Sequence, residues 1–67
     1  MNCLIVMHPK TKKIYPFTIR PNGEILIITT DPSINEDNVI VTVRPIQFID
    51  FETGYYNEYL EKESMNV

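Results

Sequence analysis

Short apolar runs and alternating apolar and polar positions, both typical of β-strands, cover most of the chain. The run at residues 2–7 predicts a first strand, which a turn-forming His-Pro pair ends. A second strand is predicted at 13–20, where alternate residues are apolar, although Pro16 cannot donate a hydrogen bond inside a sheet. Pro45 interrupts the later pattern, so its flanks form either two strands or one bent strand. The later strands are expected at 25–30, 38–44 and 46–51.

The clearest local signal is the turn Arg20-Pro21-Asn22-Gly23-Glu24, which lies between two apolar runs. Proline sets φ for the first central position of a type I turn, and glycine supplies the left-handed residue of a bulge. The segment therefore predicts a β-hairpin with a loop of either two or three residues.

The expected strand that follows this turn is apolar on both faces over residues 25–28. Both faces should therefore be covered, which one flat sheet in so short a chain cannot achieve. Three arrangements would cover them. The sheet curls into a small barrel, the C-terminal tyrosines cover one face, or another subunit does so.

The C-terminal segment allows two interpretations. Its large side chains recur with the spacing of one helical stripe, at Tyr55, Tyr56, Tyr59 and Leu60. This favours a short helix over 55–62, with Thr53 as its N-cap. The alternative is a hairpin turn with Gly54 in the left-handed conformation. The whole chain, residues 1–67, is thus expected to be one mainly β domain (small α+β): an antiparallel meander of four to five strands with a short C-terminal helix.

A chain of 67 residues buries little apolar surface, and domains of this size often need a disulfide, a metal or a partner for stability. Cys3 is the only cysteine and His8 the only histidine, which excludes an intramolecular disulfide and disfavours a metal site. We therefore expect neither a metal nor a cofactor. A partner subunit remains, and exposed strand edges favour a homodimer.

The apolar runs are far shorter than the roughly 20 residues of a membrane helix, so no membrane association is expected. The N-terminus also has neither a basic region nor a small-residue cleavage site. A single free cysteine without such a signal is typical of a reducing compartment, and we expect a cytoplasmic protein.

Candidate catalytic residues are few. His8 is expected in an exposed turn and Cys3 inside the first strand, on opposite sides of the alternation and without companions that would activate either one. The two glycines, Gly23 and Gly54, are both explained by turns, so there is no glycine-rich phosphate loop. We expect no catalytic residue, and we expect that the protein is not an enzyme.

Charge is distributed unevenly along the chain. Residues 1–30 hold four basic residues and one acidic residue, a net charge of +3, whereas residues 31–67 hold two basic and eight acidic residues, a net charge of −6. If the halves do not interleave in space, the protein has two faces with different electrostatic preferences.

The acidic, tyrosine-rich C-terminal segment is the favoured partner-binding surface. Tyrosine is enriched at the centres of interfaces, and carboxylates around it suit a basic protein partner. The sequence therefore favours a small non-catalytic interaction module, such as an inhibitor or adaptor. The competing interpretation is that the tyrosines pack on the chain's own sheet. The predicted partner-binding residues are Asp50, Glu52, Tyr55, Tyr56, Glu58, Tyr59 and Glu61.

The alternative function is a small β-barrel that binds nucleic acid through the basic hairpin at 8–20. Its cations flank two aromatic residues, Tyr15 and Phe17, and cationic grooves with aromatic platforms bind single strands. This interpretation ranks lower because a net acidic chain has no long-range attraction to phosphate, and because both aromatics lie on an apolar face. The cations are Lys10, Lys12, Lys13 and Arg20.

Overall fold

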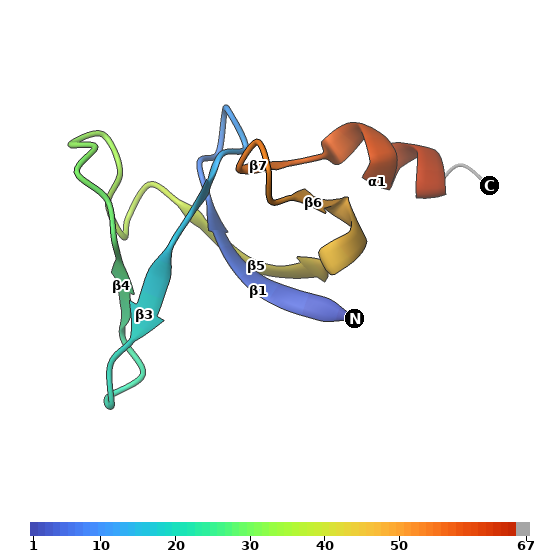
Figure 1. Ribbon diagram of the computed structural model, residues 1–67. Helices are drawn as coiled ribbons and strands as arrows, with labels where there is room; N and C mark the ends of the chain where they lie inside the picture. Colours follow the sequence, from blue (N-terminus) through green and yellow to red (C-terminus); the bar gives the residue numbers. More distant parts are fainter. Residues whose placement is uncertain (66–67) are drawn as a thin grey trace.

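The computed structural model describes residues 1–65, which form short antiparallel strands followed by one helix (Figure 1). The largest sheet has three strands, in the order β2 (Ile14–Tyr15), β1 (Asn2–Met7) and β5 (Ile40–Pro45). Two hairpins complete the strands: β3 (Phe17–Ile19) with β4 (Ile25–Ile27), and β6 (Ile49–Asp50) with β7 (Tyr55–Tyr56). The helical elements are a 3-10 turn, η1 (Ile46–Phe48), and the helix α1 (Glu58–Met65). The predicted mainly β fold with a short C-terminal helix is confirmed, and the described strands do not close into a barrel.

β1 is the central strand of the largest sheet. It pairs with β5 over its whole length, and its last two residues pair with β2 on the other side. A strand with neighbours on both edges and cover on both faces can be apolar throughout. Ile5, Val6 and Met7 are accordingly all buried, and Val6 is fully inaccessible.

The main core lies between β1 and the C-terminal half of the chain. Side chains from η1, β6 and β7 pack against one face of β1. Val6 points to the opposite face, because successive side chains in a strand alternate. Cys3, as expected, is a partly buried residue packed against this core. The core cluster consists of Ile5, Met7, Phe48, Ile49 and Tyr56.

The β6–β7 hairpin continues the edge of the largest sheet. The backbone N–H of Ile14 donates to the carbonyl of Gly54 at 2.7 Å, and the N–H of Tyr56 donates to the carbonyl of Lys12 at 2.9 Å. Lys13 and Tyr55 form an antiparallel bridge between these two bonds. The strands thus follow one another in the order β6, β7, β2, β1, β5.

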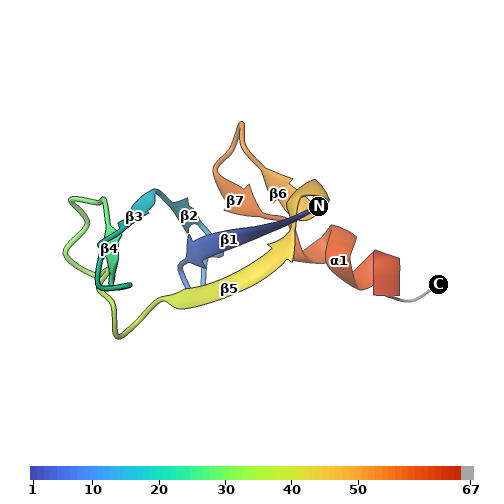
Figure 2. The same cartoon turned by 90° about the horizontal axis from the view of Figure 1, so that it is seen from below.

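Pro16 divides the strand predicted at 13–20 into β2 and β3. Its carbonyl still accepts a hydrogen bond from the N–H of Ile28, at 2.9 Å, which joins the base of the β3–β4 hairpin. Seen from below, this hairpin lies at one end of the β1–β5 pair, whereas β6, β7 and α1 lie at the other (Figure 2).

The turn predicted between β3 and β4 is confirmed, and its loop has three residues. The N–H of Gly23 donates to the carbonyl of Arg20, and the N–H of Arg20 donates to the carbonyl of Glu24, each at 2.8 Å. Gly23 has φ of +87°, the left-handed conformation expected of the bulge glycine. The register then pairs Ile19 with Ile25.

The expectation that both faces of the strand at 25–28 are covered is wrong for the single chain. Leu26 is 40% exposed and Ile28 is 56% exposed, while Ile25 and Ile27 are only half-buried. β7 and α1, the elements that carry the C-terminal tyrosines, lie away from the β3–β4 hairpin (Figure 1).

A helix was predicted over 55–62 with Thr53 as its N-cap, and both the predicted start and the predicted cap are wrong. Gly54 has φ of +78° and closes the β6–β7 turn, as the alternative interpretation required. The helix begins at Glu58, after Asn57, whose Oδ1 accepts the N–H of Leu60 at 3.1 Å. The pattern over 46–51 is likewise not one strand, because η1 separates β5 from β6.

Candidate interaction surface

Tyr56, one of the seven predicted partner-binding residues, is part of the core. It is 5% exposed and packs in the main cluster, so it does not belong to a surface. The other two tyrosines of the set are accessible, Tyr55 at 43% and Tyr59 at 70%. The helical spacing that grouped the three is broken, because Tyr55 and Tyr56 alternate in a strand and point to opposite sides.

Asp50 organises the turn that carries this surface. Its Oδ1 accepts the backbone N–H of Thr53 at 3.2 Å and that of Glu52 at 3.0 Å, and its carbonyl accepts the N–H of Gly54 at 2.9 Å. The bond from Thr53 is the main reason that the pKa of Asp50 lies below its ordinary value. The turn is therefore well defined and carries a fixed negative charge.

Phe51 is the surface residue that the sequence pattern missed. It follows β6 directly and is 72% exposed at the tip of the hairpin. The alternating pattern over 46–51 predicted that Phe51 lies in a strand. The turn-forming residues directly after it were the signal that could have placed it in a turn. Leu60, on α1, is also accessible at 43%.

Two hollows flank the β6–β7 hairpin and share Asp50 and Asn57. The first, of about 360 Å³, contains Tyr55 and Tyr59 among its lining residues, and the second, of about 420 Å³, contains Phe51. Exposed aromatic rings and carboxylates thus surround one hairpin. We call this surface the aromatic corner, defined as Asp50, Phe51, Glu52, Tyr55, Glu58 and Tyr59.

The acidic and basic halves of the chain interleave at this surface. Lys12 Nζ lies 3.3 Å from Glu58 Oε1, and Arg44 Nε lies 3.6 Å from Glu61 Oε2. The expectation of two separate charged faces therefore fails here. Within residues 1–65, Asp50 and Glu52 take part in neither of these ion pairs, so the hairpin tip keeps its negative charge.

The four cations of the alternative function do not form one patch. Lys12 is engaged by Glu58 and also donates to the carbonyl of Pro9 at 2.9 Å. The Lys13 ammonium lies 5.6 Å from the centre of the Tyr15 ring. Arg20 flanks the tip of the β3–β4 hairpin, away from the loop that carries the lysines (Figure 1).

His8 closes the turn between β1 and β2. Its Nδ1 accepts the backbone N–H groups of Lys10 at 3.0 Å and Thr11 at 3.2 Å, and the backbone N–H of His8 donates to the carbonyl of Lys13 at 2.8 Å. Its role in the structure is therefore to hold a turn. Across residues 1–65, no three His, Cys, Asp or Glu side chains are grouped as metal ligands.

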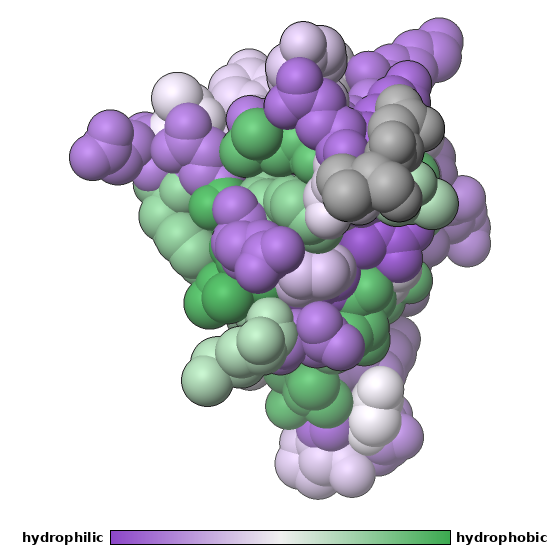
Figure 3. Space-filling model, turned by 90° about the vertical axis from the view of Figure 1, so that its right-hand side faces the viewer, coloured by the Kyte–Doolittle hydropathy of each residue, from purple (hydrophilic) through white to green (hydrophobic). Residues whose placement is uncertain are grey.

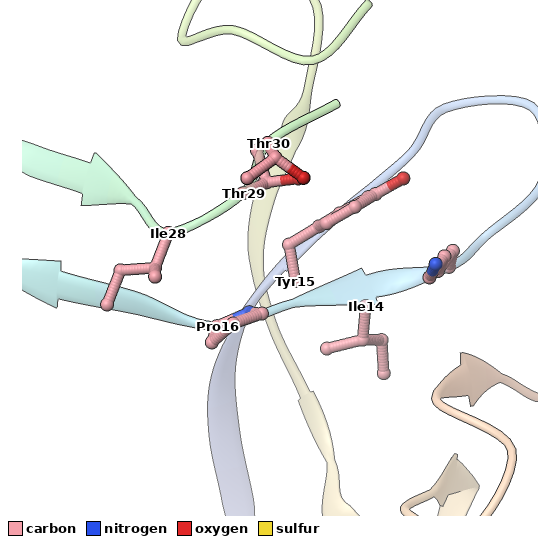
Figure 4. A pocket seen from close by; sticks show the side chains of 7 residues that line it. Ile14, Tyr15, Pro16, Ile28, Thr29 and Thr30 are labelled. Atoms are coloured by element: carbon pink, nitrogen blue, oxygen red, sulfur yellow. The ribbon is translucent and has the colours of Figure 1, made fainter. Parts of the chain in front are cut away.

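A hollow of about 460 Å³ lies where β2 meets β3 (Figure 4). The Tyr15 ring and the hydroxyls of Thr29 and Thr30 lie on one side of the strand, and Ile14 points to the other. Pro16 and Ile28 add apolar surface to the wall of the hollow. Lys13 is the charged residue among the described lining residues. These groups include neither a carboxylate nor an imidazole.

Within the described part of the chain, no helix has the length and apolar character that a membrane crossing requires. Comparisons of the chain with protein-family models, with curated proteins and with solved structures found no match.

Proposed function

We propose that this chain is a small, non-catalytic protein-interaction module that binds a basic protein partner through the aromatic corner. The observation that carries the proposal is the exposure of Phe51 and Tyr59, at 72% and 70%, beside carboxylates on the same hairpin and helix turn. Isolated apolar residues are common on surfaces, but aromatic residues gathered around a fixed turn are typical of binding sites. An adaptor or an inhibitor would use such a surface.

The charge of the corner supports a basic partner. Asp50 and Glu52 flank Phe51 and hold no ion pair within residues 1–65, so they are free to meet lysine or arginine. Such rim charges mainly accelerate association and select the partner, while buried aromatic rings supply most of the affinity. Glu58 contributes less, because Lys12 already neutralises it.

The proposal also includes the cellular compartment and the oligomeric state of the protein. The free, half-buried thiol of Cys3 supports a reducing compartment such as the cytosol. The small core of the chain supports a homodimer as the working species, because small domains without a disulfide commonly gain stability by association. Nucleic-acid binding through the basic hairpin has less support, since the cations are dispersed and partly neutralised.

The test compares capture of a partner by the parent chain and by a Phe51→Ala/Tyr59→Ala variant, from a lysate of the source cell divided into nuclease-treated and untreated halves. Met65→Ala is the matched control, because Met65 is 76% exposed at the end of α1 and outside the corner. We expect the parent and control to retain one stoichiometric protein, and the double variant to bind it at least about tenfold more weakly.

Added salt should weaken the same complex, because the rim contacts are ionic. Circular dichroism should show that the double variant remains folded, since both replaced side chains are exposed. Equal binding by all three proteins would contradict the proposal. So would the recovery of nucleic acid alone, lost after nuclease treatment.

A further inference from the structure

The β3–β4 hairpin carries apolar side chains that the rest of residues 1–65 leaves partly or largely exposed. A two-stranded hairpin is at best marginally stable in water unless it packs against something. None of its apolar residues is buried, and Ile19 and Ile28 are exposed at 54% and 56%. Separate hydrophobic patches, interrupted by hydrophilic residues, reach toward the lower end of the molecule (Figure 3). The residues concerned are Phe17, Ile19, Ile25, Leu26, Ile27 and Ile28.

A groove of about 230 Å³ separates this hairpin from β5. Ile25 and Ile27 line one side of it, and Val39 and Val41 line the other, with Glu36 as the only charged residue of the lining. Val43, which shares a face of β5 with Val41, is 54% exposed. We call this surface the apolar strip, defined as Ile19, Ile25, Ile27, Val41 and Val43.

The strands beside the groove each have a free edge. Among residues 1–65, β4 pairs only with β3, and β5 pairs only with β1. Free edges are usually protected by charge, proline or a bulge. β4 has neither a charge nor a proline over Ile25–Ile27, and β5 has none before Arg44. These edges are therefore open to another strand.

The chain exposes more surface than a compact monomer of its size, enough to accommodate a partner of dimer scale. The accessible surface is 5015 Å² for a mass of 7.9 kDa, whereas a compact monomer of that mass exposes about 4400 Å². The radius of gyration is 12.6 Å, against about 11 Å for a compact chain of this length. The excess of about 600 Å² approaches the roughly 800 Å² that each partner buries in a standard interface.

We propose that the apolar strip is the contact between two copies of this chain, packed strip against strip about a two-fold axis. An almost uncharged strip gives no preference for a basic or an acidic partner, but it complements itself in an isologous pair. The proposal rests on the homodimer inferred above and is independent of the basic partner. It leaves the aromatic corner free, because the two surfaces share no residue and the β6–β7 hairpin lies away from the β3–β4 hairpin (Figure 2).

Sedimentation equilibrium of the full chain, from about 1 μM to about 1 mM protomer, tests the contact. We expect the parent to dimerise with a dissociation constant in the micromolar range. Val41→Lys and Ile19→Lys should each raise that constant at least about tenfold, because the two-fold axis brings the added charges of both copies into an apolar contact. Met65→Lys is the control: Met65 is apolar and, at 76%, more exposed than either strip residue, but it lies outside the strip and should change the constant less than about twofold.

Two strip variants are used so that the test still gives an answer if one of them fails to fold. A lysine at position 41 lies in the groove beside Glu36, and Ile19 is 54% exposed, so both variants should fold. If one unfolds by circular dichroism, the other decides. A parent that stays monomeric to about 1 mM would overturn both the pairing and the surface. Dimers of both strip variants as tight as the parent would overturn the surface while leaving the homodimer in place.

Discussion

Within residues 1–65, three residues with positive φ shape the turns, at Gly23 (+87°), Gly54 (+78°) and Lys12 (+65°). The glycines adopt this conformation without a steric penalty, and both were assigned to turns from the sequence. Lysine adopts it at some cost. Contacts made by Lys12 offset that cost, because its N–H donates to the carbonyl of His8 and its ammonium reaches both Glu58 and a turn carbonyl.

Gly23→Val should destabilise the protein by about 1–3 kcal/mol, because valine resists positive φ. Nothing lies within 4 Å of the position that a Cβ would take, so the loss would come from the backbone rather than from a clash. Urea unfolding measures the difference. Gly23→Asn is the control and should lose less, because asparagine tolerates the left-handed region. An unchanged free energy of unfolding in Gly23→Val would contradict the turn geometry.

For the secondary-structure elements, the pattern of apolar and polar residues located most strands but did not determine where each one begins and ends. The first strand was predicted with its observed bounds, and the hairpin turn was predicted because proline and glycine dictate its angles locally. Residues 55 and 56 instead satisfied a helical stripe, yet they form β7, because the N–H of Tyr56 pairs with the carbonyl of Lys12, far away in the sequence. Pairing between distant segments cannot be read from a local window.

The same limit applied to the candidate surface. Its acidic residues and the exposure of Tyr59 could be anticipated from composition, whereas the core position of Tyr56 depended on the strand pairing. Phe51 was missed because alternation over the preceding residues assigned it to a strand rather than to the turn. The ion pair between Lys12 and Glu58 also joins residues far apart in sequence.

Asn57→Ala should destabilise α1 by about 1 kcal/mol, because Asn57 Oδ1 caps the free N–H of Leu60. Thr53→Ala replaces the N-cap expected from the sequence and should leave the helix intact, since Thr53 precedes β7. Backbone carbon chemical shifts over residues 58–65 measure helix population in both variants. Equal fraying of the helix in both, or a greater loss in Thr53→Ala, would place the cap elsewhere.

At the scale of the whole molecule, stability should be distributed unevenly. The chain measures 40 × 24 × 21 Å, and its core cluster lies between β1 and the C-terminal elements. The β3–β4 hairpin contributes no buried residue. Pro16, which separates β2 from β3, connects the hairpin to the rest of the molecule. Regions with few buried apolar contacts open more readily than the rest of a protein.

Hydrogen exchange in dilute solution should therefore show weaker protection for the paired amides of the β3–β4 hairpin than for those of Ile5 and Met7. Nuclear magnetic resonance resolves the individual amides. Raising the protein concentration should slow exchange in the hairpin selectively, if the apolar strip mediates pairing. Uniform protection in dilute solution would instead mean that the hairpin unfolds together with the core.

The separation of the aromatic corner from the apolar strip has a further consequence. Since the β6–β7 hairpin lies away from the β3–β4 hairpin (Figure 2), two chains joined at their strips would each keep a corner exposed. Such an assembly is a bivalent ligand, because it offers two equal binding ends. On a partner with two basic sites at a matching separation, the second contact becomes intramolecular and gains an effective concentration on the order of millimolar. Weak contacts at each corner would then combine into strong avidity. The distance between the two corners of the dimer would determine which spacing of the partner's sites allows both contacts at once.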